Sequence, residues 1–262
     1  RTASVTPMNG SSRFDIPLEE QRQMWNRWNT AAREERQGPV SQRQAQVVCE
    51  WLQDTGRRDL DIIDVGCGTG WLCRRLLEFG RVTGTDLADE VLSRAQQRVP
   101  PATFIAGDFM RLPFEGARFD IAIALEVLSH VDDQPEFLGR MATLLRPGGL
   151  LMLATQNRPV LERWSEVGPP APGQIRRWVD ARTLRKLLLP DFELLRLVSI
   201  VPVGDQGALR FVNSVKLNRA LVALFGADRI ERVKERAMLG HTLMVLARKP
   251  AAIGRSGPAT RR

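Results

Sequence analysis

The sequence contains little of the chemistry on which disulfide-stabilised or zinc-binding proteins depend. Its 262 residues include three cysteines, Cys49, Cys67 and Cys73, and neither their odd number nor their spacing suits a disulfide framework or a zinc site. There are two histidines and no tyrosine, so few side chains can exchange protons near neutral pH. The sparse, unpaired cysteines predict a reducing, cytoplasmic environment.

Long hydrophobic runs and internal repeats are also missing. No apolar run reaches the length that crosses a bilayer, and residues 1–12 lack the apolar core of a signal peptide. Hydrophobic residues make up 43% of the chain and charged residues 26%, which suits one globular domain with a substantial core. We expect a disordered N-terminus over residues 1–14, a single domain over 15–250 and a disordered tail over 251–262.

The charge balance is basic, because 38 lysines and arginines outnumber 30 aspartates and glutamates and give a net charge of +8. Such an excess raises two alternatives, a nucleic acid or an anionic membrane as partner. Most of the excess is arginine scattered along the chain, which favours a compositional origin. We therefore expect no nucleic-acid partner, and contact with a membrane surface is the less favoured alternative.

Residues 62–70 comprise the end of an apolar strand and a glycine-rich turn. The glycines occupy alternate positions, Gly66, Gly68 and Gly70. A strand that turns this tightly into a helix needs residues without Cβ, so that the backbone can approach a ligand. A dinucleotide site would need its third glycine at position 71, which is Trp71. A phosphate loop would need a lysine that this turn lacks.

Acidic residues end the next two apolar stretches. Asp86 lies about twenty positions after the turn, where nucleotide-binding α/β folds place an acceptor for ribose hydroxyls. The alternative role of Asp86, a helix N-cap, suits Asp89 better. Asp108 ends a third stretch, and further apolar strands follow at residues 119–131 and 144–155. Strands that alternate with amphipathic segments predict a parallel sheet buried on both faces.

These pieces, in this order, resemble the class I methyltransferases that use S-adenosyl-L-methionine (SAM). The resemblance implies an α/β fold with a Rossmann-like seven-stranded sheet of order 3-2-1-4-5-7-6 and helices on both faces. It also implies SAM as cofactor and S-adenosyl-L-homocysteine (SAH) as product. The residues that it assigns to cofactor binding are Arg43, Asp64, Gly66, Cys67, Gly68, Gly70, Asp86, Leu87, Asp108, Phe109 and Leu125.

Three helical segments are expected outside the sheet. Residues 15–37 place Trp25 and Trp28 on one helical face, which predicts either a packed amphipathic helix or, as the resemblance suggests, a lid over the methyl donor. A second helix follows, with Ser41 as its predicted N-cap. About forty residues, 204–240, separate strands six and seven and form a predicted helical insertion, apolar on one side and basic on the other. We favour it as a wall of the acceptor pocket over a membrane-contacting surface.

Within the family, the segment 42–198 resembles the ubiquinone-biosynthesis O-methyltransferase group. The similarity lies in Arg43, in the segments 125–131 and 155–158, and in Trp178-Val179-Asp180. It implies a small, partly apolar acceptor with a reactive hydroxyl such as a phenol. Ser129 stands where that group has a glutamate, and the insertion is unfamiliar. The residues that we expect to bind the acceptor are Trp25, Trp28, His130, Asn157 and Trp178.

Methyl transfer from a sulfonium needs no general acid, but a hydroxyl acceptor must lose a proton. His130 follows strand four and is the candidate base, with a structural role as the alternative. A metal held by Glu126 with Asp132 or Asp133 is not expected, because these carboxylates lack a dense ligand spacing. Two other functions remain as alternatives, a SAM-binding regulatory protein without turnover and an RNA methyltransferase. The latter is disfavoured because Leu125-Glu126-Val127-Leu128 replaces the Asn/Asp-Pro-Pro-aromatic signature.

Overall fold

The computed structural model describes residues 16–32, 38–165, 167–201, 226 and 238–251. Its strands are β1 Leu60–Val65, β2 Gly80–Asp86, β3 Thr103–Ala106, β4 Phe119–Leu125, β5 Leu145–Gln156, β6 Glu193–Ile200 and β7 Thr242–Arg248. Its helices are α1 Leu18–Ala32, α2 Pro39–Gln53, α3 Cys73–Leu76, α4 Asp89–Arg98, the 3₁₀ helix η1 Leu128–His130, α5 Gln134–Leu144, α6 Arg158–Trp164 and α7 Ala181–Leu188.

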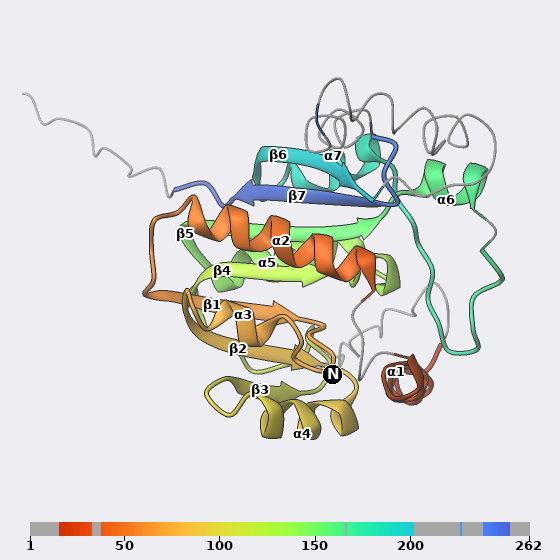
Figure 1. Ribbon diagram of the computed structural model, residues 1–262, viewed down its shortest axis with the longest axis horizontal. Coiled ribbons are helices and arrows are strands. Elements are labelled where there is room, and N and C mark those ends of the chain that lie inside the picture. Colours follow the sequence, from red (N-terminus) through yellow and green to blue (C-terminus); the bar gives the residue numbers. More distant parts are fainter. Residues whose placement is uncertain (1–15, 33–37, 166, 202–225, 227–237, 252–262) are drawn as a thin grey trace, which may run out of the picture.

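The seven strands form one sheet of order β3-β2-β1-β4-β5-β7-β6, which confirms the predicted order (Figure 1). Strands β1 to β5 pair in parallel, and β7 runs antiparallel to both β5 and β6. The parallel strands therefore end at one edge of the sheet. In such sheets ligands bind beyond the carboxyl ends of the strands, where the strand order reverses.

Alternating strand residues feed two separate cores, one on each face of the sheet. Ile62 packs into the core under α2, α3 and α4, whereas its neighbour Ile63 packs into the core under α5 and α7. Both side chains are fully buried. This alternation explains the near-continuous apolar runs of the central strands, since a strand covered on both faces has no solvent side. The helices on both faces agree with the expected fold.

Two expected helix caps are not formed. The N-cap position of α4 is Ala88, and Asp89 instead accepts hydrogen bonds from Arg22 at 2.6 Å and from Asn26 at 3.0 Å, both on α1. Helix α2 begins at Pro39 after Gly38, so Ser41 lies inside its first turn. Proline at the first helical position fixes the start, because its backbone angle is already helical and it lacks the N–H that a cap would satisfy.

Several predicted segments lie outside the described residues. These are the N-terminus 1–14, the end of the first helical segment at 33–37, nearly all of the insertion 204–240, and the tail beyond residue 251. Within the described chain, no helix combines the length and the apolar character needed to cross a membrane.

Candidate active site

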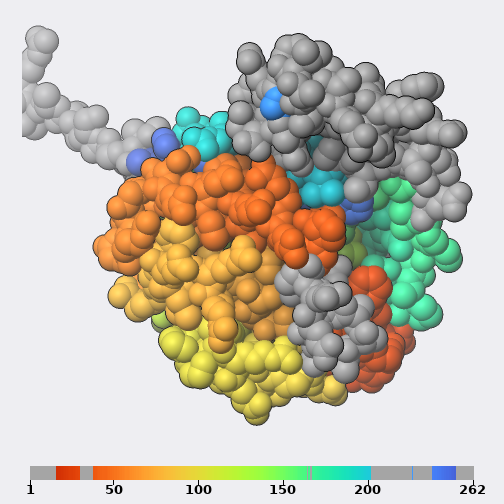
Figure 2. Space-filling model, in the orientation of Figure 1, coloured from red at the N-terminus to blue at the C-terminus, as the bar shows by residue number. Residues whose placement is uncertain are grey.

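A cavity of about 1020 Å³ opens at the carboxyl ends of the parallel strands. Helix α1 lies beyond these ends and contributes Trp25 and Trp28 to the wall (Figure 1). The segment before α7 packs against α1, since a Cβ on Gly173 would lie 2.8 Å from the Glu20 carbonyl oxygen. Figure 2 shows α1 beside this green segment at the surface. A cavity of this volume is large enough for a nucleoside-sized ligand together with a small second molecule.

The glycine turn after β1 forms one wall of the cavity. Gly66 has φ +72° and Gly68 has φ +54°, angles that residues with a side chain rarely adopt. A Cβ on Gly66 would lie 2.3 Å from Val127 Cγ2, so the close approach of the two chains also requires glycine. Gly70 has φ +69° but packs against Phe104 and does not line the cavity. Bare backbone at residues 66–68 therefore faces the ligand space, and Gly70 serves the packing behind it.

Asp86, the last residue of β2, lies in the cavity wall next to this turn. One carboxylate oxygen accepts the Gly68 N–H at 2.8 Å and the other accepts the Ala88 N–H at 2.8 Å. Burial raises the pKa of Asp86, and the backbone donors oppose that rise. Each oxygen keeps further acceptor capacity, because an ionised carboxylate offers about four lone-pair sites. The carboxylate is thus oriented to receive hydroxyl donors from a ligand.

Asp64 was also predicted to bind the cofactor, but it does not line the cavity. Its side chain is buried below the glycine turn, where one oxygen accepts the Cys73 thiol at 3.5 Å. Burial raises the pKa of Asp64 to about 7. The reason is the pleat: Asp64 is the penultimate residue of β1, so its side chain points into the core under α2 to α4.

Asp108 and Phe109, both predicted at the site, line the cavity as well. Asp108 accepts the Met110 N–H at 3.0 Å, which closes a tight turn after β3. Phe109 packs edge-on against Phe137 with ring centroids 5.4 Å apart. Three other predicted cofactor residues also line the cavity: Cys67, Leu87 and Leu125.

Arg43 and Asn157 were predicted at the site, and the structure places both outside the cavity lining. Arg43 points along α2 towards Glu50, with 3.5 Å between guanidinium and carboxylate. Its neighbour Gln44 faces the cavity instead. Asn157 donates its side-chain amide to the carbonyls of Met238 and Gly240 at 3.0 and 2.8 Å. It therefore ties the end of β5 to the chain that leads into β7.

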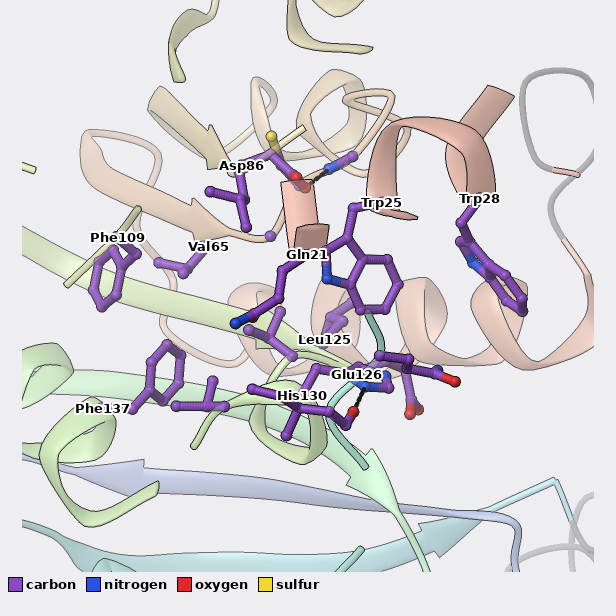
Figure 3. Close-up of a pocket in the computed structure, with 18 of the residues that line it drawn as sticks. Gln21, Trp25, Trp28, Val65, Asp86, Phe109, Leu125, Glu126, His130 and Phe137 are labelled. Atoms are coloured by element: carbon purple, nitrogen blue, oxygen red, sulfur yellow. Dashed lines mark hydrogen bonds between the residues drawn. The ribbon is translucent and has the colours of Figure 1, made fainter. Parts of the chain in front are cut away.

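Aromatic rings gather on the other side of the cavity. The Trp25 ring meets the His130 ring edge-on, with centroids 4.7 Å apart and planes at 68°. His130 Nδ1 lies 2.7 Å from the Ile175 carbonyl oxygen, which can only accept, so Nδ1 carries the proton and Nε2 is the basic nitrogen. In Figure 3, Trp25 projects from α1 between Asp86 on one side and His130 on the other. Trp28 and Trp178, also predicted, complete this aromatic lining.

Glu126 occupies the turn after β4 with φ +63°, a rare angle for a residue with a long side chain. Its Oε1 accepts Gln44 Nε2 at 2.5 Å and Thr242 Oγ1 at 2.9 Å. Gln44, Gln156 and His241 line the cavity beside it, although no sequence pattern predicted them there. The described chain contains no group of three or more His, Cys, Asp or Glu side chains arranged to hold a metal ion.

Comparisons with known proteins agree with this geometry. Residues 63–153 match a family model described as a methyltransferase domain. The ubiquinone biosynthesis O-methyltransferases of two Rhodopseudomonas palustris strains are 33% and 36% identical over 141 and 146 residues. The chain contains a class I SAM-dependent methyltransferase domain. These matches cover 50% and 52% of this chain, and 54% and 55% of the relatives. The chain thus spans about half the length of the curated relatives it matches.

A solved structure extends the likeness of the methyltransferase domain to nearly the whole chain. The N-methyltransferase NodS from Bradyrhizobium japonicum, crystallised with SAH, superposes with a TM-score of 0.61 over 88% of this chain and 99% of NodS. Its sequence identity is 17%, so the likeness supports the fold alone.

Proposed function

We propose that this chain transfers a methyl group from SAM to a hydroxyl oxygen of a small, partly apolar acceptor such as a phenol. The observation that carries the proposal is a single cavity with two chemically different halves. The Asp86 carboxylate and bare glycine backbone form one half, and the Trp25–His130 ring pair forms the other. The similarity to O-methyltransferases supports oxygen as the nucleophile.

The residues of the first half fit SAM. Asp86 would accept the ribose hydroxyls, because its carboxylate is already oriented by two backbone N–H groups. A Cβ on Gly68 would lie 3.3 Å from Asn29 Oδ1, so a side chain there would fill the space between the turn and α1. Asp108 and Phe109 would hold the adenine, with Leu87 and Leu125 as apolar neighbours.

Bound SAM supplies a methyl group on a positively charged sulfur, and its leaving group is a neutral thioether. The chain must then orient the acceptor, exclude water and take the acceptor's proton. Trp25, Trp28 and Trp178 offer flat apolar surfaces for the acceptor. Two imidazoles on the cavity, those of His130 and His241, are able to take the proton. The free, buried thiols of Cys67 and Cys73 agree with a reducing, cytoplasmic location.

The test has two stages. SAH binding by isothermal titration calorimetry comes first, and we expect saturable binding that Asp86→Asn weakens. Transfer of the tritiated methyl group of SAM to phenol and catechol is then measured with the full chain. Methylated product from either compound supports the proposal. Tight SAH binding without transfer to any member of a wider phenol panel would favour the alternative, a SAM-binding regulatory protein.

A further inference from the structure

A line of hydrogen-bonded side chains crosses the cavity floor, between the carboxyl end of β4 and the amino end of β7. His241 Nδ1 lies 3.1 Å from Thr242 Oγ1. Thr242 Oγ1 lies 2.9 Å from Glu126 Oε1, and Gln44 Nε2 lies 2.5 Å from the same oxygen. His241, Glu126 and Gln44 all line the cavity, and Thr242 is buried behind them. The line therefore joins an imidazole at the ligand space to a carboxylate through one hydroxyl.

The donors and acceptors in this line fix where the imidazole proton lies. The single hydroxyl proton of Thr242 is directed to Glu126, because the carboxylate oxygen accepts it. Thr242 Oγ1 can then only accept at His241, so His241 Nδ1 carries the ring proton. The basic nitrogen of neutral His241 is consequently Nε2. A positive charge on this ring would be stabilised by Glu126 through the threonine hydroxyl.

The backbone holds this arrangement in place. The His241 N–H donates to the Val201 carbonyl at 2.9 Å, and the His241 carbonyl accepts the Asn157 N–H at 2.8 Å. Glu126 keeps its strained φ of +63° while its N–H donates to the Ala154 carbonyl at 2.9 Å. Backbone strain of this kind persists only where the surroundings over-determine it, and it is concentrated at functional sites.

Burial acts on the charge of the His241 ring. It lowers the pKa of His241, which favours the neutral ring with its lone pair. His130 differs in the partner of its ring N–H, because Nδ1–H donates to the Ile175 carbonyl, which carries no formal charge. Several charged side chains share the cavity with both rings. They are Asp86, Asp108, Arg111, Glu126, Asp132, Asp133, Glu136 and Arg176.

Gln156 adds an acceptor beside this line. It ends β5 directly opposite Thr242 of β7, so the two side chains lie on the same face of the sheet. The Gln156 Oε1 atom is buried and has no hydrogen-bond partner within the described chain, although the residue lines the cavity. A buried amide oxygen without a partner costs free energy, which a ligand donor would recover.

We propose that His241 is the base that takes the acceptor's proton, that Thr242 and Glu126 are positioning residues for it, and that Gln156 accepts a second hydrogen bond from a donor next to the reacting hydroxyl. This inference rests on the proposed function and deepens it. The favoured acceptors carry neighbouring O–H or N–H donors, as catechols do. His130 then orients the acceptor ring together with Trp25.

The proton transfer balances within the site. The acceptor O–H bond breaks, its electron pair stays on oxygen as the nucleophile, and the proton passes to His241 Nε2. The resulting imidazolium donates from Nδ1 to Thr242, whose hydroxyl donates to Glu126. After the methylated product leaves, the Nε2 proton passes to water in the open cavity.

The first experiment tests the hydrogen-bonded line without needing any acceptor. Because the chain has two histidines, protein labelled with ¹⁵N-histidine gives resonances from only two imidazoles, and His130→Gln and His241→Gln assign them. We expect His241 to be neutral near pH 7 with the proton on Nδ1, and we expect Thr242→Val to change that tautomer balance or the titration midpoint. The matched control Thr143→Val, on an exposed threonine of α5, should leave the spectrum unchanged. A protonated His241, an Nε2–H tautomer or no response to Thr242→Val overturns the positioning role.

The second experiment measures catechol methylation as a function of pH. We expect His241→Asn to lower kcat about a hundredfold or more and to remove the acidic limb of the pH profile. His130→Asn should chiefly raise the KM for catechol and keep that limb. Loss of the limb in His130→Asn instead would overturn the proposal and return the base to His130.

Substrate preference tests Gln156. Gln156→Leu should lower the ratio of kcat/KM for catechol to kcat/KM for phenol at least tenfold. Gln46→Leu, on the exposed side of α2, should leave this ratio unchanged. An unchanged preference in Gln156→Leu overturns its role. If the wild-type protein methylates neither compound nor a wider phenol panel, the proposed function fails together with the base role, and the NMR result alone then decides on the hydrogen-bonded line.

Discussion

Replacing Asp86 by asparagine tests the cofactor site most directly, because the two side chains have nearly the same shape. The aspartate receives N–H donors on both oxygens, from Gly68 and from Ala88 at 2.8 Å each. An asparagine must present its own NH₂ group to one of these donors. The substitution therefore removes the charge and places a donor against a donor at the edge of the ligand space.

The expected loss follows from the hydrogen bonds that the carboxylate offers to ribose hydroxyls. A hydrogen bond to a charged group contributes about 1.5–3 kcal/mol. Losing the equivalent of one such bond raises the Kd for SAH about tenfold or more. The opposed donors also cost stability, and burial, which raises the pKa of Asp86 and disfavours its charged form, offsets part of that cost.

The assay is isothermal titration calorimetry with SAH, combined with thermal unfolding of each variant. Asp64→Asn is the control, since Asp64 is a buried aspartate near the end of the adjacent strand but does not line the cavity. We expect Asp64→Asn to keep the wild-type affinity within about threefold. Wild-type SAH affinity in a folded Asp86→Asn variant, or equal losses in both variants, would refute the assignment of the ribose site to Asp86.

Three further outcomes are expected. Gly66→Ala should abolish SAH binding and lower the unfolding free energy by about 1–3 kcal/mol, because the new Cβ would lie 2.3 Å from Val127 Cγ2. The control Gly168→Ala has open space around it and should change neither SAH affinity in calorimetry nor the thermal unfolding temperature. The pKa of Asp64 is about 7 in the folded protein against 3.8 in the unfolded chain, so its contribution to stability is complete below pH 3.8 and is lost as pH rises to 7. Urea unfolding of the wild type should show this decline in stability. The same decline in Asp64→Asn would contradict its assignment to Asp64. Trp25→Ala should raise the KM for the acceptor about tenfold and retain SAH affinity, since Trp25 contacts His130. Initial-rate kinetics would disprove this prediction if Trp28→Ala, at a half-exposed tryptophan, raised the KM more.

The central strands were predictable from sequence because each carries its own apolar run, whereas their order in the sheet followed from the resemblance to class I methyltransferases. Strand ends were less certain. Strand β6, for example, ends at Ile200, where Val201 takes φ +52° and leaves the extended conformation. Helix α1 and its aromatic face were also predicted, because the spacing of Trp25 and Trp28 is local information.

The polar floor of the site could not be predicted, because its members come from separate parts of the fold. Gln44 lies on α2, Gln156 ends β5 and His241 precedes β7, and each is a single polar residue without a local pattern. Only the pairing of β5 with β7 and the packing of α2 bring them together. The wrong prediction for Asp89 has the same cause. Its local position suggested a helix cap, but the fold brings Arg22 and Asn26 of α1 into hydrogen-bonding contact with it.

The attachment of α1 has a consequence for the order of events in a catalytic cycle. Through Arg22 and Asn26 the helix is tied to Asp89, directly after the strand that bears Asp86, and through Trp25 it covers His130. Under the proposed function this single helix would cover both ligands, with its fixed contacts on the nucleoside side. We expect a compulsory order in which the nucleoside ligand enters first and leaves last, and a dissociation rate that rises with ionic strength because the half-exposed Arg22–Asp89 ion pair is open to screening.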